Sequence, residues 1–533
     1  MVYGQWIQNK TFLTTMNENR GKILWIDDEI DHLKPHILFL QEKGYEITTS
    51  SNGKDGIDKV SSHSFDLILV DQFMPGIDGM ETVEKIKMSN PSIPIIMITK
   101  SEEEWLMDEA IYKKIDHLLI KPVNPNQIFV ACKQILENII IHSEKSKTEY
   151  LSQFQNLELL ADQAESIDDW WNIYTKLIKW QLDFEFQSEE SLIQILNEQL
   201  NSCNKKFSRF IIQNYQSWLN SKDRPTLSCD IFSKKINPLL SDNKKVCLVV
   251  MDAMRYDQFM ELYPLFSENY SINIESSVSL LPSATPYSRN AIFSGLFLDE
   301  LCEKYPKQKQ DMINDTGSLN NHEGEFLSDQ LHQHGFGNKK MHYHKIWAVA
   351  EGKRFQSKIK SYLNNDLLAI VVNFVDQLAH RRSESDVLKE MVPDEAGYRQ
   401  AVRSWYKKSW IRQVLHELSS EGFNVIITSD HGSIMVNDSA VVAADKNSSS
   451  GIRYKYGINI NSSEKKAIDI RNLKDYRLPI LEERTNYLIA KDNFFFLYPN
   501  DQRKYKKLLE NSFQHGGISI EEMLIPIFTM KPK

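Results

Sequence analysis

The stretch Val246-Cys247-Leu248-Val249-Val250-Met251-Asp252 decides the fold of the C-terminal part of the chain. Six consecutive apolar residues predict a strand that is buried on both faces, as in a parallel sheet covered by helices. The runs 367–372 and 424–428 follow the same pattern, and they end near Asp376 and at Asp430. Because the carboxyl ends of parallel strands share one edge of the sheet, we expect a single polar crevice there.

Further acidic and histidine residues accompany these strand ends. Asp376 and His380 are four residues apart, so one helical turn or tight loop can aim both side chains at the same ion. Asp430 is followed directly by His431, and His515 lies in a glycine-containing turn. Mixed carboxylate and imidazole ligands suit Zn²⁺ best, with Mn²⁺ as the main competitor.

Three segments resemble the PglZ branch of the alkaline phosphatase superfamily, over about residues 225–533: 251–257, Ser283-Ala284-Thr285-Pro286, and 515–522. The resemblance implies an alkaline-phosphatase-like α/β domain in which the Thr285 hydroxyl is the catalytic nucleophile. Threonine in place of serine resembles the phosphodiesterase members of the superfamily more than the monoesterases, which implies cleavage of diesters over monoesters. The resemblance also implies two zinc ions, the first held by Asp252, Thr285, Asp430 and His431, and the second by Asp376, His380 and His515.

The N-terminal part predicts a second, separate sheet. Short apolar runs alternate with helical patterns, which favours a doubly wound, flavodoxin-like parallel sheet. The residues that fall at the carboxyl ends of these strands would again share one crevice. The expected strands are 23–26, 45–48, 65–70, 93–98 and 117–120.

The acidic residues of this second crevice predict phosphoryl transfer. Three carboxylates in one place repel one another and need a hard cation such as Mg²⁺, with the carbonyl of Phe73 as a further ligand. Asp71 could then attack phosphorus, while Lys121 pairs with the phosphoryl oxygens and Thr99 donates a hydrogen bond. The three carboxylates are those of Asp27, Asp28 and Asp71.

The string 71–79, Asp-Gln-Phe-Met-Pro-Gly-Ile-Asp-Gly, resembles two-component response-regulator receiver domains, over about residues 21–140. The resemblance implies that Asp71 is the phosphorylated residue. One departure is Leu118, which stands where receivers usually have an aromatic switch residue. The usual coupling of threonine to an aromatic residue is therefore in doubt, but the phosphorylation chemistry is not.

The rest of the chain organises around these two parts. Residues 141–224 have a helical pattern with almost no Gly or Pro, which predicts a helical bundle whose core holds tryptophans. We expect 1–20 to be a poorly ordered leader, with Met16 as an alternative start. The polar stretches 303–324 and 437–477 are expected to be surface insertions or mobile lids.

Composition narrows the possible partners. A net charge of −9 over 533 residues disfavours a mainly electrostatic DNA binder, and no basic helix-turn-helix pattern follows the receiver. Five dispersed cysteines indicate reduced thiols. No run approaches the 18 or so apolar residues of a membrane span. We therefore expect a cytoplasmic protein without direct membrane insertion, for which DNA binding is disfavoured.

Several basic and polar residues are candidate substrate contacts. Arg255 could bind a phosphate or pair with Asp257, and both interpretations stay open. The stretches 341–345 and 453–457 mix basic and aromatic residues, which fits either a nucleotide-binding surface or a polar loop. The candidate substrate contacts are Arg255, Arg289, Asn290, His342 and Lys345, with Arg453 on the same grounds.

A receiver, a helical bundle and a PglZ domain in this order resemble the PorX-type response regulators of Bacteroidetes, which are linked to type IX secretion and gliding. The resemblance implies a sensor histidine kinase as phosphodonor, and secretion-machinery or sigma-factor partners. We expect phosphorylation of Asp71 to promote homodimerisation. The predicted activity is a zinc-dependent phosphodiesterase acting on nucleotide-type substrates, such as cyclic or short oligonucleotides. The alternative is a zinc-stabilised, non-catalytic signalling or binding module that acts through protein partners.

Overall fold

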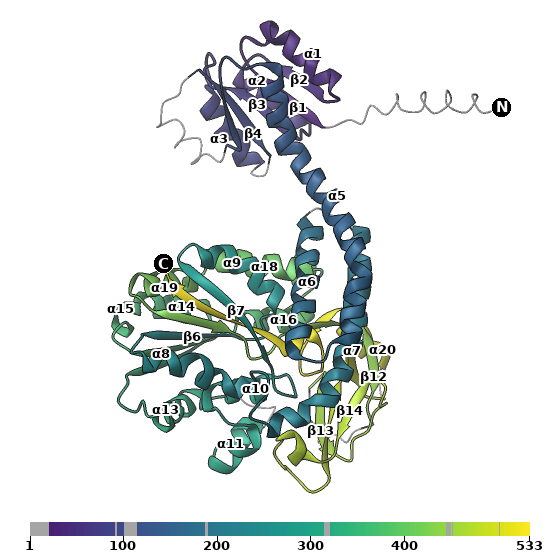
Figure 1. The fold of residues 1–533 in the computed structure, drawn as a ribbon, viewed down its shortest axis with the longest axis vertical. Coiled ribbons are helices and arrows are strands. Elements are labelled where there is room, and N and C mark those ends of the chain that lie inside the picture. Colours follow the sequence, from purple (N-terminus) through teal and green to yellow (C-terminus); the bar gives the residue numbers. More distant parts are fainter. Residues whose placement is uncertain are drawn as a thin grey trace, which may run out of the picture. The chain divides into compact units, whose positions relative to one another are not determined.

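The computed structural model describes residues 21–90, 93–100, 115–186, 190–313, 320–443, 449, 451–499 and 502–533. The chain divides into two compact units, one ending at Glu149 and the other beginning at Tyr150 (Figure 1). The expected leader 1–20 lies outside the described residues. Within the described ranges, every helix is too short or too polar to span a bilayer.

The first unit is built on a five-stranded parallel sheet in the order β2-β1-β3-β4-β5. This is the flavodoxin-like strand order that the sequence predicted. Alternate residues of β1 enter two different hydrophobic cores, one on each face of the sheet. The strands are β1 (Lys22–Ile26), β2 (Glu46–Ser50), β3 (Leu67–Asp71), β4 (Ile95–Thr99) and β5 (His117–Ile120).

The described helices of this unit are placed by local sequence signals. Asn52 and Asp78 cap their helices by accepting hydrogen bonds from backbone N–H groups. The connection between β4 and β5 falls largely outside the described residues. The helices are η1 (Ile30–Leu33), α1 (Lys34–Glu42), α2 (Gly53–Ser62), α3 (Gly79–Ser89) and the start of α5 (Pro125–Gln163).

The second unit is built on a six-stranded sheet in the order β7-β18-β10-β6-β9-β8. The last four strands in this order are mutually parallel, whereas β18 is antiparallel to both of its neighbours. The three strands predicted at 246–251, 367–372 and 424–428 are therefore confirmed as central parallel strands. The strands are β6 (Val246–Met251), β7 (Tyr270–Val278), β8 (Met341–Ile346), β9 (Leu367–Val372), β10 (Asn424–Thr428) and β18 (Leu524–Pro532).

Helices cover both faces of this sheet (Figure 1). Val246, Leu248 and Val250 of β6 enter the core shared with α10 and α13, and the residues between them enter the core shared with α9, α18 and α19. The α-helices of the sheet domain, from residue 225 onward, are α8 (Asn237–Ser241), α9 (Tyr256–Ser267), α10 (Thr285–Ser294), α11 (Leu298–Lys304), α12 (Lys309–Ile313), α13 (Glu323–Gln333), α14 (Val349–Ser357), α15 (Ile359–Tyr362), α16 (Phe374–Glu384), α17 (Asp386–Met391), α18 (Glu395–Lys408), α19 (Trp410–Ser420), α20 (Gln502–Leu509) and α21 (Ile520–Met523).

The stretch 437–477, expected to be a surface insertion or a mobile lid, forms regular secondary structure in its described part. Three strands lie within it, and residues of two of them, Ala440 of β12 and Ala467 of β14, form a small core with β15 and β16. The strands are only four or five residues long, so their apolar positions are diluted by polar loops. The smaller sheets consist of β11 (Ile434–Val436), β12 (Asp438–Val441), β13 (Tyr454–Ile458), β14 (Ala467–Ile470), β15 (Thr485–Ala490), β16 (Phe494–Leu497) and β17 (Ser512–Gln514).

The helices that follow α5 share one core with the six-stranded sheet. These helices are α6 (Ile167–Phe186) and α7 (Glu190–Asn220). Trp170 and Trp180 are buried in that core, and the ring of Trp171 lies 4.8 Å from that of Tyr256 in α9. The tryptophans are packing residues, as predicted: the rings of Trp170 and Trp180 lie against aromatic rings of these helices, whereas Trp171 packs α6 onto the C-terminal domain.

Candidate active site

Three neighbouring parallel strands place polar residues at one edge of the sheet. Asp252 follows β6, Asn373 follows β9, and Asp430 comes two residues after the end of β10. Ser429 joins two of these ends, because its hydroxyl donates to the carbonyl of Met251 at 2.5 Å and accepts from an amide after Asp252. The crevice expected at the strand ends is therefore present.

The first group of candidate ligands surrounds the hydroxyl of Thr285. Ligand atoms of Asp252, Asp430 and His431 all lie within 4.8 Å of one another, and all three residues are buried. Thr285 Oγ1 lies 3.0 Å from His431 Nε2 and 3.4 Å from Asp252 Oδ1. Thr285 is the first residue of α10, where the positive end of the helix dipole favours an anion.

The donor set of this first group fits a metal cation. His431 Nδ1 lies 3.0 Å from the carbonyl oxygen of Gly432, so this nitrogen carries the proton and leaves the lone pair on Nε2. Asp430 Oδ2 is buried and has no hydrogen-bond partner in the described part of the chain. A buried carboxylate oxygen without a donor is costly, and a cation would satisfy it.

The second group adjoins the first. Asp376 and His380 lie four residues apart on α16, with His380 Nε2 3.2 Å from Asp376 Oδ1. His515 Nε2 lies 3.6 Å from the same oxygen. The ring of His515 stacks on that of His431 with centroids 4.3 Å apart, so the two groups form one constellation.

Burial and crowding set the charges of these groups. Burial, together with the charge of Asp430, raises the pKa of Asp252 to about 7, although Arg289 acts against this. Burial also acts to raise the pKa of Asp376, but the hydrogen bond and the charge of His380 outweigh burial and hold that pKa well below its usual range. Burial and the neighbouring His431 lower the pKa of His515 far below its ordinary value, so its imidazole is neutral. Neutral imidazoles and carboxylates are the ligand forms that a divalent metal needs.

The candidate phosphate contacts Arg255, Arg289 and Asn290 are all buried. Arg255 pairs with Asp257 and Glu395, so the ion-pair interpretation is the one that the structure shows. Arg289 donates to Asp252 and to Glu323, which places it beside the first group as a partner of Asp252. The side-chain amide of Asn290 donates to a carbonyl within its own helix.

The stretch 341–345 is a strand, β8, so its alternate side chains point to opposite faces. His342 stacks on Tyr362 with ring centroids 4.2 Å apart. Lys345 faces the other side, where its Nζ lies 4.9 Å from the ring centroid of Trp347. Arg453 is fully buried and pairs with Glu522, so it is a structural residue and its interpretation as a nucleotide contact is wrong.

Three residues of the constellation were missed from the sequence. Asn373 donates to Asp252 Oδ2 at 2.8 Å, and the rule that strand ends carry functional residues could have found it. Ser429 stands beside Asp430 in the sequence but carries no signal of its own. Glu323 lies in the stretch 303–324, which was expected to be a surface insertion, yet it is buried against Arg289.

The first unit contains the predicted acidic crevice. Ligand atoms of Asp27, Asp28 and Asp71 lie within 4.8 Å of one another. Lys121 Nζ lies 2.8 Å from Asp71 and 3.1 Å from Asp27. Burial raises the pKa of Asp71 and acts against the charge of Lys121, but the carboxylates outweigh this and raise the pKa of Lys121. The side chain of Phe73 is 54% exposed, and the hydroxyl of Thr99 donates to Gln72.

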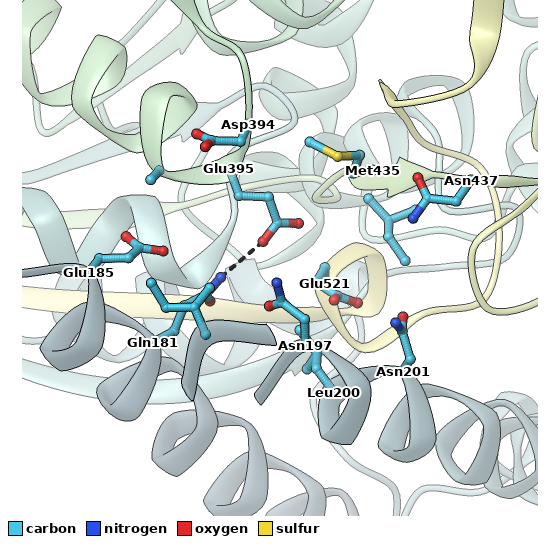
Figure 2. Close-up of a pocket in the computed structure, with 13 residues that line it drawn as sticks. Gln181, Glu185, Asn197, Leu200, Asn201, Asp394, Glu395, Met435, Asn437 and Glu521 are labelled. Carbon is cyan, nitrogen blue, oxygen red and sulfur yellow. Dashed lines mark hydrogen bonds between the residues drawn. The ribbon is translucent and has the colours of Figure 1, made fainter. Parts of the chain in front are cut away.

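A separate cavity of about 240 Å³ lies between α6 and α7, here called the linker helices, and the sheet domain (Figure 2). Gln181 of α6 donates to Glu395 across it at 3.0 Å. Glu521 also lines the cavity, and burial, together with repulsion from Glu395, raises its pKa to about 7. No candidate metal ligand lines this cavity, so it is distinct from the constellation around Thr285.

Comparison with known families agrees with this division of the chain. The BREX system PglZ alkaline phosphatase-like domain matches residues 231–530, which is more than half of the chain. The response regulator receiver domain matches 23–133, and the PorX response regulator linker domain matches 140–219.

Individual relatives cover only part of this chain. The transcriptional regulatory protein ResD of Bacillus subtilis (strain 168) is 27% identical over 226 residues, covering 36% of this chain and 92% of ResD. The transcriptional regulatory protein ZraR of Klebsiella oxytoca is 32% identical over 134 residues, which are 25% of this chain and 30% of ZraR. The chemotaxis protein CheY4 of Vibrio cholerae is 29% identical and covers 22% of this chain and 98% of CheY4, with a TM-score of 0.21.

The chain belongs to the PglZ family of alkaline phosphatase-like domains and carries a response regulator receiver in front of that domain. The linker match between them gives the chain the domain arrangement of the PorX-type response regulators.

Proposed function

We propose that the chain is a response regulator, phosphorylated on Asp71, whose C-terminal domain is a zinc-dependent phosphodiesterase with Thr285 as nucleophile. The observation that carries this proposal is the convergence of seven side chains from distant parts of the sequence. They lie in two adjoining groups, and the hydroxyl of Thr285 contacts the first group.

Two metal sites follow from the two groups. Asp252, Thr285, Asp430 and His431 would hold one ion, and the second group would hold the other. Neutral imidazoles mixed with carboxylates favour Zn²⁺ over harder cations. When bound, the pair of ions would supply Lewis-acid polarisation of the phosphoryl group and an acidified hydroxyl at position 285. The second group is Asp376, His380 and His515.

The protein itself positions the nucleophile. Thr285 begins α10, so its hydroxyl lies at the helix end whose dipole favours a phosphoryl group. In the first step a bond forms between Thr285 Oγ1 and phosphorus, the bond to the leaving ester oxygen breaks, and that oxygen leaves as an alcohol. In the second step water attacks the phosphothreonine, which releases a phosphomonoester and restores the hydroxyl.

The receiver would accept a phosphoryl group from a sensor histidine kinase. The bond between phosphorus and the histidine nitrogen of the kinase breaks as the bond to Asp71 forms. Mg²⁺ held by Asp27, Asp28, Asp71 and the carbonyl of Phe73 would neutralise the charge, and Lys121 and Thr99 would contact the phosphoryl oxygens. Lys121 already lies within 2.8 Å of Asp71.

The proposal also includes a substrate class and protein partners. A diester of nucleotide type, such as a cyclic or short oligonucleotide, fits a threonine nucleophile in this superfamily. Phosphorylation would promote homodimerisation and thereby alter hydrolysis. Control of type IX secretion and gliding, through secretion-machinery or sigma-factor partners, is part of the same proposal, and the PorX-like arrangement supports it.

The test is Thr285→Val in the zinc-loaded full chain, assayed on bis-p-nitrophenyl phosphate and p-nitrophenyl phosphate. We expect the unchanged protein to cleave the diester faster, and the variant to lose at least about a hundredfold in rate because the nucleophile is gone. Thr529→Val, in β18 and outside the constellation, is the matched control. Faster monoester cleavage would overturn the diesterase assignment.

Absence of turnover in the unchanged zinc-loaded protein would favour the non-catalytic module. In that case Thr285 serves only as a ligand, and Thr285→Val leaves the binding of protein partners unaltered. Circular dichroism and zinc content distinguish a loss of catalysis from a loss of fold.

A further inference from the structure

Trp347 stands at the same sheet edge as the metal constellation. Ile346 of β8 pairs with Val372 of β9, and Val372 pairs with Met251 of β6. The next residues on these three parallel strands are Trp347, Asn373 and Asp252. Because adjacent strands are about 4.8 Å apart, the backbone of Trp347 lies about 10 Å from that of Asp252. A single nucleotide bridges this span from phosphate to base.

The side chain of Trp347 lies on the face of the sheet that carries α10. Lys345 Nζ is 4.9 Å from the centroid of the Trp347 ring. Tyr343, two residues before Lys345 on the same face of β8, donates to Glu323, the partner of Arg289 in α10. Burial lowers the pKa of Lys345, while Glu323 and Asp252 act in the opposite direction, which agrees with this placement.

The indole ring of Trp347 is exposed, while the backbone of this residue is held by hydrogen bonds. Trp347 is 47% exposed, so it is not a core residue. Its carbonyl accepts from Gln377 at 2.8 Å, and its N–H donates to Glu351 at 2.9 Å. Gln377 is the neighbour of Asp376 on α16. The backbone of Trp347 is therefore tied to the helix that carries two candidate ligands.

We propose that Trp347 is a stacking platform for an unpaired nucleobase next to the scissile phosphate, a role that rests on the proposed phosphodiesterase function. An exposed indole stacks on any base, because every base presents a π face. Lys345 places a positive charge beside the stacked base and its phosphate. The substrate class is thus a single-stranded or cyclic oligonucleotide, because a base inside a duplex is already stacked and cannot reach the ring.

The test compares two diesters with the same leaving group, p-nitrophenyl thymidine 5′-monophosphate and methyl p-nitrophenyl phosphate. In the zinc-loaded full chain, Trp347→Ala should lower kcat/KM for the nucleotide about tenfold, because stacking is lost. Trp347→Ala should change kcat/KM for the methyl diester less than twofold. Trp347→Phe should restore most of the kcat/KM that is lost for the nucleotide. Val349 is also exposed and lies two residues away, so Val349→Ala is the control, and it should leave kcat/KM unchanged for both substrates.

Equal losses on both substrates, or no loss on either, would overturn the stacking role while leaving the phosphodiesterase standing. Equal effects of Trp347→Ala and Val349→Ala would instead indicate an apolar surface unrelated to the base. A second arm measures binding of thymidine 5′-monophosphate by calorimetry in the Thr285→Val background. There we expect Trp347→Ala to weaken binding about tenfold, and an unchanged Kd overturns the proposal even if the protein has no turnover.

Discussion

At the scale of single residues, Asp252 is the most constrained carboxylate of the constellation. Arg289 and Asn373 both donate to its Oδ2, and Oδ1 faces Thr285 and His431. One oxygen is thus held by the protein while the other faces the candidate metal position. The hydrogen bonds to Oδ2 therefore orient the Asp252 carboxylate before a metal binds. Hydrogen-bond partners of metal ligands generally have this effect.

Glu521 supports a prediction about pH. Its pKa is raised from 4.5 to about 7, with burial as the main cause and repulsion from Glu395 as the next. The folded state therefore holds a proton that the unfolded state releases, and stability falls as the pH rises from about 4.5 to 7. Glu521→Gln should raise the free energy of unfolding by about 1–3 kcal/mol at pH 8 and leave it unchanged near pH 4.5.

Thermal unfolding of the two proteins at both pH values measures this difference. Glu303→Gln, at an exposed position on α11, is the control and should show no gain at either pH. If Glu521→Gln raised the free energy of unfolding equally at both pH values, the prediction would be contradicted, because the effect could not come from the proton on Glu521.

At the scale of elements, continuous apolar runs were sufficient to predict the central strands. The residues 246–251, 367–372 and 424–428 are buried on both faces and almost free of polar side chains, so the sequence pattern and the structure coincide. The short strands β12, β13 and β14 were not predicted, because their burial comes from side chains far along the chain. Arg453 shows the difficulty: a buried arginine is recognisable only once its partner Glu522 is known.

The constellation was predictable only in part, for the same reason. Asp376 and His380 were predictable from their four-residue spacing. Asp252 and Asp430 were predictable because they follow buried strands. Glu323 has neither signal, since only the fold brings it beside Arg289.

The linker helices give a prediction about folding units. Tyr215 of α7 accepts a hydrogen bond from the amide of Leu281, four residues before Thr285, at 2.8 Å. Asn204 of α7 bonds to Glu521 and to the amide of Ile520. A fragment of residues 150–533 should therefore unfold cooperatively, whereas residues 225–533 should aggregate, because removing α6 and α7 exposes the shared core.

Circular dichroism and size-exclusion chromatography of the two fragments decide this. A monomeric, cooperatively folded 225–533 fragment would show that the helices are an independent domain, as the sequence pattern suggested.

At the scale of the whole molecule, the proposed function requires that phosphorylation of the receiver changes the state of the chain. A phosphoryl group on Asp71 would draw Lys121 away from Asp27 and change the charge of the crevice. We expect acetyl phosphate with Mg²⁺ to convert the monomer to a dimer, as measured by size exclusion with light scattering. Asp71→Asn is the control and should stay monomeric, and a chain that stays monomeric with Asp71 intact would refute the switch.

Anomalous X-ray scattering at the zinc edge, on crystals of the full chain grown with zinc, tests the central claim most directly. The account predicts two peaks in the C-terminal domain, one among Asp252, Asp430 and His431 and one among Asp376, His380 and His515. The absence of a zinc peak at both places, with only water between these side chains, would contradict it.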